Sequence, residues 1–135
     1  MNYKIIAAFF VLTLAFYSIG LGGVALLDPD EPVYAQTARE MVETGSWLTP
    51  RLNGLLWFDK PPMYFWLSAV SFKAFSVSEF AARFPSALMA SLLVVLVYAW
   101  ALRAFGDEKT AAYSALTLAS ALLFVFISRA AVTDM

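Results

Sequence analysis

The sequence contains no cysteine and no histidine among its 135 residues. Without cysteine this chain has no disulfide bond and no thiolate chemistry. Without histidine it lacks the commonest metal ligand and the usual acid–base group near neutral pH. Charged residues are also scarce, at 14% against the roughly 25% usual in soluble domains. Acid–base chemistry in this chain therefore falls to aspartate, glutamate, lysine or tyrosine.

Hydrophobic residues are abundant, at 61% of the chain, and the mean hydropathy is +0.73. This composition is typical of a membrane protein. The net charge of -1 gives no argument for nucleic-acid binding, so no nucleic-acid partner is expected. The sequence stops at Asp134-Met135, just past an apolar run. We interpret the chain as the N-terminal portion of a longer protein, with a complete small membrane protein as the alternative.

Three uncharged segments predict transmembrane helices over residues 5–27, 84–102 and 110–128, because a spanning helix needs about 20 apolar residues. The alternative for 5–27 is a cleaved signal peptide. The apolar core of a signal peptide is about 7–15 residues long and precedes a small-residue cleavage motif. Residues 5–27 are longer and lack that motif, which favours a retained span.

A polar loop over residues 28–83 separates the first two predicted spans. Asp30 stands at an N-cap position, and residues 31–44 predict a short helix that Gly45 ends. Residues 63–75 are apolar and aromatic but too short to span, so they predict a helix lying in the membrane interface; a short, kinked span is the alternative. The expected fold is an all-α membrane protein with three transmembrane helices and a polar external loop carrying short juxtamembrane helices.

Three spans and one surface helix place Asp30 and Asp134 on the same side of the membrane, where the two acids can share one cavity. Orientation is harder to predict. With the N-terminus inside, six cations lie outside and three inside, which opposes the positive-inside tendency. Either the topology is inverted or the outer cations are kept for function, such as binding a lipid phosphate; we favour the second interpretation.

The external loop carries a series of short motifs in a fixed order. They are Asp30-Glu31-x-x-Tyr34-Ala35, Ala38-Arg39-Glu40-Met41, Gly45-x-Trp47-x-x-Pro50, Asp59-Lys60-Pro61-Pro62 and, after two further predicted spans, Thr133-Asp134-Met135. This series resembles the first external loop of the C-superfamily membrane glycosyltransferases. It is most similar to the bacterial lipid A aminoarabinose transferases and more distantly to the protein O-mannosyltransferases.

The resemblance implies a many-helix membrane bundle that takes a sugar from a polyprenyl-phosphate donor. It implies that Asp30 is the catalytic base, that Lys60 helps hold the donor phosphate, and that Asp134 lines the same catalytic cavity. It also implies a lipid (lipid A-like) or protein acceptor, contact with membrane lipids, and an active site on the periplasmic face of a bacterial inner membrane.

Two positions depart from the aminoarabinose transferase pattern. Val33 stands where that group tends to have arginine, and Asp59 stands where it tends to have glutamate before Lys-Pro. The change at Val33 weakens an assignment of lipid A as acceptor or aminoarabinose as sugar.

The residues themselves suit this chemistry, which needs a base, a cation for the departing phosphate and a dry wall for the lipid. A helix dipole would favour ionised Asp30, whereas neighbouring acids would raise its pKa; the alternative is that Asp30 only caps a helix. Lys60 could stabilise phosphate oxygens or simply snorkel to water. Arg39 could bind the donor phosphate or pair with Glu43 on the helix surface.

Three further residues, Glu31, Tyr34 and Asp59, are expected to line the cavity. A divalent metal is possible, because carboxylates suit hard cations, but no spacing matches a known metal loop and the metal stays unassigned. Two other functions compete with glycosyl transfer. A transporter or channel fragment would place charges inside its spans, and none is found there. A non-catalytic membrane scaffold would be distinguished from a glycosyltransferase only by its lack of activity or by the sequence that follows residue 135.

Overall fold

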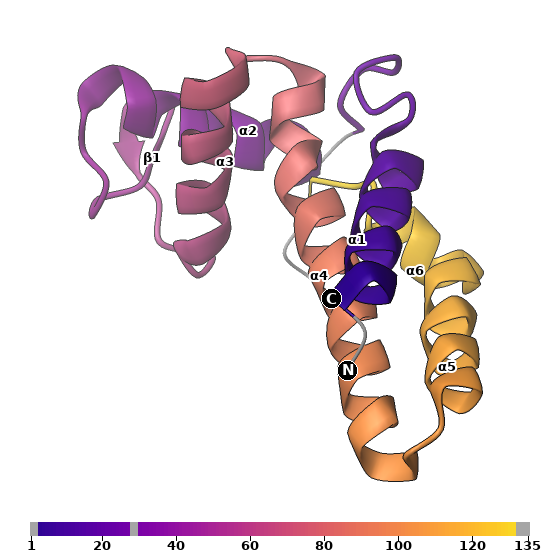
Figure 1. Cartoon of the computed structure of the whole chain (residues 1–135). Coiled ribbons are helices and arrows are strands. Elements are labelled where there is room, and N and C mark those ends of the chain that lie inside the picture. Colours follow the sequence, from indigo (N-terminus) through magenta and orange to yellow (C-terminus); the bar gives the residue numbers. More distant parts are fainter. Residues whose placement is uncertain (1–2, 28–29, 132–135) are drawn as a thin grey trace. The chain divides into compact units, whose positions relative to one another are not determined.

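The computed structural model describes residues 3–27 and 30–131. In these residues the chain forms six helices and one two-stranded hairpin, divided between two compact units (Figure 1). The first unit combines the chain up to Ile19 with Ala87–Arg129, and the second combines Gly20–Ser86 with the chain from Ala130. Helix α4, Glu79–Phe105, begins in the second unit and continues into the first.

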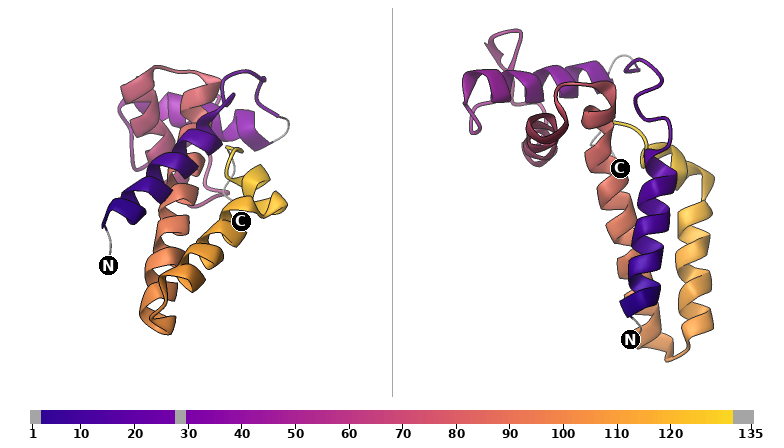
Figure 2. Two further views of the ribbon diagram at one scale, coloured as in Figure 1. Left: turned by 45° about the vertical axis from the view of Figure 1, so that its right-hand side comes forward. Right: turned by 45° about the horizontal axis from the view of Figure 1, so that its top comes forward.

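The first unit contains α1 (Tyr3–Ser18), α4 from Ala87 onward, α5 (Glu108–Ser120) and α6 (Leu122–Ile127). The right-hand view of Figure 2 shows α1, this part of α4 and α5 running alongside one another. The rings of Phe9 and Tyr98 lie 5.3 Å apart, and the Tyr17 hydroxyl donates to the Ala119 carbonyl at 3.0 Å. Small buried side chains let the helices approach closely: Ala101, Ala111 and Ala115.

Helix α4 is the one helix, within the described residues, that is long and apolar enough to cross a membrane. Its 27 residues span about 40 Å at 1.5 Å per residue. It extends beyond the predicted 84–102 at both ends. A helix that began at residue 84 would have Pro85 in its first turn. Because α4 begins at Glu79, Pro85 lies in the second turn.

The prediction of a helix over the whole of residues 5–27 is wrong at its C-terminal end, because α1 stops at Ser18 after 16 residues. Gly20 then takes a positive φ of 74°, and the Gly23 N–H donates to the Gly20 carbonyl. Glycine adopts such a conformation without steric cost and disfavours a continuing helix. Residues 19–27 are a loop.

The predicted helix over 110–128 is also interrupted. Helix α5 ends at Ser120, Ala121 has an extended backbone, and α6 covers only Leu122–Ile127. The Ser120 hydroxyl donates to the Leu116 and Thr117 carbonyls, a type of contact that bends helices. The prediction of three transmembrane helices is therefore not confirmed by the described residues.

The second unit contains α2 (Asp30–Thr44), strands β1 (Arg51–Leu52) and β2 (Leu55–Leu56), and α3 (Met63–Phe75). The strands pair antiparallel, with Arg51 opposite Leu56, so the expectation of an all-α fold is incomplete. Their turn is Asn53-Gly54, with φ of 53° and 78°. Asn-Gly is a strong hairpin signal because both residues tolerate positive φ. The hairpin was not predicted, although this signal is present in the sequence.

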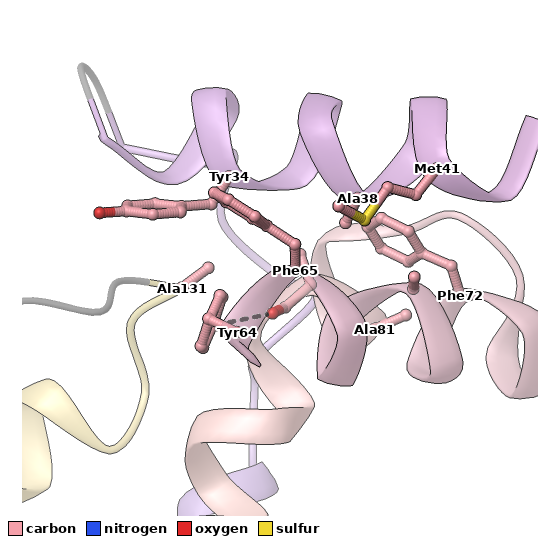
Figure 3. Close-up of a cluster of buried hydrophobic side chains, with 10 residues drawn as sticks. Tyr34, Ala38, Met41, Tyr64, Phe65, Phe72, Ala81 and Ala131 are labelled. Carbon is pink, nitrogen blue, oxygen red and sulfur yellow. Dashed lines mark hydrogen bonds between the residues drawn. The ribbon is translucent and has the colours of Figure 1, made fainter. Parts of the chain in front are cut away.

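A hydrophobic core joins α2 to α3 (Figure 3). The helical periodicity of residues 31–44 predicts one apolar face, made of Tyr34, Ala38 and Met41. All three side chains are buried in the structure. The bounds predicted for α3 are confirmed. A helix in the membrane interface would use its aromatic side chains as anchors. That expectation is wrong for three of the five aromatic residues of α3, because they are buried in this core: Tyr64, Phe65 and Phe72.

Candidate functional site

Asp30 is the first residue of α2, and it is exposed. The sequence predicted a helix that begins at residue 31, with Asp30 as its N-cap; in the structure Asp30 is already helical. Asp30 is therefore a carboxylate that is accessible to a ligand, at the N-terminal end of α2.

Glu31 has the opposite environment, with only 3% of its surface exposed. Its Oε1 accepts from the Arg83 Nε at 2.9 Å and from the Ala131 N–H at 2.6 Å. Its Oε2 accepts from the Arg83 Nη2 at 2.6 Å and from the Leu27 N–H at 2.7 Å. A carboxylate has about four acceptor positions, and all of those of Glu31 are taken.

The ionised form of Glu31 is stabilised by these bonds. Burial by itself raises the pKa of Glu31, but hydrogen bonds from Arg83, Leu27 and Ala131 and the charge of Arg83 outweigh it and hold this pKa below its usual value. The sequence predicted Glu31 as a cavity-lining residue. In this structure both of its oxygens accept hydrogen bonds from the protein itself. A role of Glu31 in lining a cavity stays a prediction.

Arg83 completes this buried cluster. Besides the two bonds to Glu31, its Nη1 donates to the carbonyls of Leu21 and Val24, both at 2.8 Å, and its Nη2 donates to the Ala25 carbonyl at 2.9 Å. A guanidinium carries five N–H donors, and all five are used. In the sequence Arg83 directly precedes the predicted span over 84–102, a position at which a cation usually only anchors the helix end, and nothing local marks a partner 52 residues away.

The chain after α6 is held in the same unit by two side chains. Glu31 binds the Ala131 N–H, and the Ser86 hydroxyl donates to the Ala130 carbonyl at 2.6 Å. Ser86 also shares a hydrogen bond of 3.1 Å with the Tyr64 hydroxyl, and burial raises the pKa of Tyr64 to about 12. Asp134, the second predicted catalytic acid, lies outside the described residues.

Tyr34, a predicted cavity-lining residue, packs in the core with 1% of its surface exposed. Its ring lies 6.4 Å from that of Trp57 and 5.7 Å from that of Tyr64. These two aromatics flank the segment of Asp59, which is exposed, and Lys60, which is half-buried. Tyr34, one helical turn after Asp30, thus contacts an aromatic residue on each side of the Lys-Pro segment.

Arg39, the second residue predicted to bind the donor phosphate, is exposed and pairs with Glu43 at 2.6 Å. It lies nine positions after Asp30 on one continuous helix. At 3.6 residues and 5.4 Å per turn, this places it on the opposite side of α2 and about 13 Å further along. This geometry favours the surface ion pair; a role in donor binding stays a prediction.

The helical periodicity of residues 31–44 predicts Glu40 on the polar face of the helix. In the structure Glu40 is buried. Its carboxylate accepts from the N–H groups of Asn53 at 2.7 Å and Gly54 at 3.0 Å, and from the Gln36 amide at 2.8 Å. Burial raises the pKa of Glu40, but these bonds and the charge of Arg51 lower it overall. Glu40 thereby fixes the hairpin turn to α2.

No metal site is formed by the part of the chain that the structure describes: it contains no group of three or more acidic side chains able to hold an ion. Asp28 and Asp134 are outside that part. The unit does present an exposed carboxylate, Asp30, on a rigidly held helix end, and a lysine, Lys60, on a neighbouring segment. This pairing of residue types suits a base and a phosphate-binding cation.

Comparison with known proteins gives relatives that match most of the chain. The chain is 40% identical over 120 residues to an uncharacterized protein of Aquifex aeolicus, covering 89% of the chain and 23% of that protein. It is 37% identical over 130 residues to undecaprenyl phosphate-alpha-4-amino-4-deoxy-L-arabinose arabinosyl transferase 2 of Sodalis glossinidius, covering 96% of the chain and 22% of that protein. The chain thus spans less than a quarter of the length of these relatives.

Solved structures agree with the sequence relatives. The crystal structure of ArnT from Cupriavidus metallidurans bound to undecaprenyl phosphate matches 96% of the chain with a TM-score of 0.81 and 31% identity, over 24% of that protein. The same protein in the apo state gives a TM-score of 0.85. Residues 2–135 match the family of dolichyl-phosphate-mannose-protein mannosyltransferases. On this match over nearly its whole length, the chain belongs to the dolichyl-phosphate-mannose-protein mannosyltransferase family.

Proposed function

We propose that this chain is the N-terminal portion of an integral membrane glycosyltransferase that transfers a sugar from a polyprenyl phosphate, with Asp30 as the catalytic base. The observation that carries the proposal is the similarity, over 96% of the chain, to ArnT crystallised with undecaprenyl phosphate. The apolar helix α4 supports a membrane location.

The adjacent acids Asp30 and Glu31 support the choice of base. A base needs an unprotonated oxygen within reach of the proton that it removes. The oxygens of Glu31 are all engaged by the protein, whereas Asp30 is exposed at the end of α2. In this proposal Lys60 stabilises the departing phosphate, Asp59 lines the cavity, and Asp134 completes it.

The acceptor is proposed more broadly, as a lipid similar to lipid A or another hydroxyl- or phosphate-bearing acceptor at the periplasmic face. Val33 stands where the aminoarabinose transferases tend to have arginine. For that reason the proposal includes sugars other than aminoarabinose.

The proposal is tested with the complete gene product in proteoliposomes containing a radiolabelled sugar on undecaprenyl phosphate and a lipid extract as acceptor. Asp30→Asn should lower turnover by about 10²-fold or more, since general bases contribute that much. Lys60→Ala should raise the KM for the donor or lower turnover.

Glu108→Gln is the matched control, because Glu108 is also an exposed carboxylate in the first residue of a helix, α5. It should leave turnover unchanged. Wild-type turnover in correctly folded Asp30→Asn protein would disprove the assignment of the base. Absence of any sugar transfer by the wild-type protein, with several lipid-linked sugars, would count against a transferase and favour a membrane scaffold.

A further inference from the structure

We propose that Glu31 and Arg83 act together as positioning residues, which hold the end of α2 that carries Asp30 in one arrangement for the reaction. This inference rests on the proposed function. It concerns residues that do not touch the substrate and that act through the backbone to which they bind.

The first step is that Glu31 binds backbone on two distant segments. It accepts from the N–H of Leu27, in the chain that leads to Asp30, and from the N–H of Ala131, in the chain that leads to Asp134. One carboxylate therefore connects residues that are 104 positions apart in sequence, 27 and 131. Glu31 is also the immediate neighbour of Asp30, so movement of its backbone moves the base.

The second step is that Arg83 fixes Glu31 itself. The guanidinium donates two N–H groups to the carboxylate, and its other three go to the carbonyls of Leu21, Val24 and Ala25. Lysine could not replace this fork, since an ammonium is a point charge without planar, bidentate geometry. The rotamer of Glu31 is thereby set by α4 and by the loop before α2.

The third step concerns the chain at Ala130 and Ala131. Ser86 donates to the Ala130 carbonyl, so residues 130 and 131 are held by two side chains from two different helices, α4 and α2. The Ala131 N–H in turn donates to Glu31, so this segment also helps to hold the carboxylate next to Asp30.

The pair differs from an ordinary stabilising ion pair in what its loss should do. A displacement of about 1 Å at a reacting group can cost about 10²-fold in rate. We therefore expect folded variants of the pair to lose kcat, whereas an element that only stabilises the fold would lower the amount of folded protein and leave the kcat of the folded fraction unchanged.

The test uses the complete protein in proteoliposomes, with the same radiolabelled undecaprenyl-phosphate sugar. Glu31→Gln and Arg83→Lys should each lower kcat by about 10-fold or more, with the KM for the donor changed less than about 3-fold, because neither residue touches the donor. The double variant should be little worse than either single variant, since residues that act as a unit are not additive. Glu108→Gln and Arg103→Lys, exposed charges of the first unit, are the controls.

Ser86→Ala keeps the test decisive if the charge variants do not fold, because it removes only the hydroxyl that binds Ala130. It should lower kcat several-fold without a change in KM. Unchanged kcat in folded Ser86→Ala and in any folded Glu31 variant would overturn the positioning role. Asp30→Asn is assayed in parallel: if it is fully active, the assignment of Asp30 as the base fails and the positioning role fails with it, whereas an inactive Asp30→Asn with a normal Glu31→Gln overturns only the positioning role.

Discussion

Asp30 and Glu31 are adjacent carboxylates with opposite environments: Asp30 is exposed at the first residue of α2, whereas Glu31 is buried with four hydrogen bonds to its two oxygens. Successive residues of a helix are about 100° apart around its axis, so one side chain can point into the protein while its neighbour points out. The motif Asp-Glu thereby combines an available acid with the anchor that holds it.

Removing one partner of the buried pair should be costly. Glu31→Leu or Arg83→Met leaves an uncompensated buried charge, and such single changes typically cost about 3–5 kcal/mol. The double variant should recover part of this loss, but not all, because three carbonyls and two N–H groups of the backbone also lose their partner. Thermal unfolding of the complete protein in detergent measures this; a double variant as stable as wild type would contradict it.

Stability should fall in acid partly through Glu31. Its pKa is lowered in the folded protein, so its contribution is fully present above the unfolded carboxyl pKa of about 4.3 and is lost as the pH falls through the folded pKa. The midpoint of thermal unfolding, followed from about pH 7 to about pH 3, should therefore decrease less steeply in Glu31→Gln than in wild type. Identical pH dependence in the two proteins would be evidence against this contribution.

The hairpin should detach locally when Glu40 is removed. Glu40→Ala deprives the N–H groups of Asn53 and Gly54 of their acceptor, and each such hydrogen bond contributes about 0.5–1.5 kcal/mol to stability. Hydrogen exchange followed by mass spectrometry should show faster exchange over residues 51–56, with α3 unchanged. Glu43→Ala is the control, because Glu43 is an exposed residue of the same helix that pairs with Arg39. Equal protection of the hairpin in both variants would exclude the role of Glu40.

Gly54 should resist substitution for a reason that concerns the backbone alone. Its φ is +78°, and a Cβ built there meets nothing within 4 Å. Gly54→Ala should therefore cost about 1–2 kcal/mol, the penalty of the left-handed conformation for an L-residue. Gly54→Asn should cost less, since asparagine tolerates this conformation. Hydrogen exchange of the hairpin distinguishes the two variants, and equal effects would indicate a steric cause instead.

Local signals in the sequence were sufficient for some elements. Helix α3 begins after Pro61-Pro62 and ends before Ser76, which has a φ of 64°, and its predicted bounds of 63–75 are confirmed. Helix α2 begins one residue before its predicted start. In contrast, uncharged composition predicted spans but not their interruptions at Gly20 and Ala121, because hydropathy reports the environment of a segment and not its backbone conformation.

The candidate site shows the same division. The motifs predict Asp30 and Lys60 as site residues, whereas the contacts of Arg83 and Glu40 join distant parts of the chain. Glu31 meets Arg83 across 52 residues and Ala131 across 100. Periodicity within a helix carries no information about such partners, so only the folded structure assigns these charges.

The cluster around Glu31 also has a consequence for biosynthesis. A ribosome makes the chain from the N-terminus, so Glu31 is synthesised 52 residues before Arg83 and 100 residues before Ala131. Until Arg83 emerges this carboxylate lacks its counter-ion, and until Ala131 emerges it still lacks one of its N–H donors, so burying it before then would be costly. The end of α2 that carries Asp30 therefore reaches its final arrangement only after α4, α5 and α6 have been made, which keeps the site incomplete while the nascent chain is being inserted.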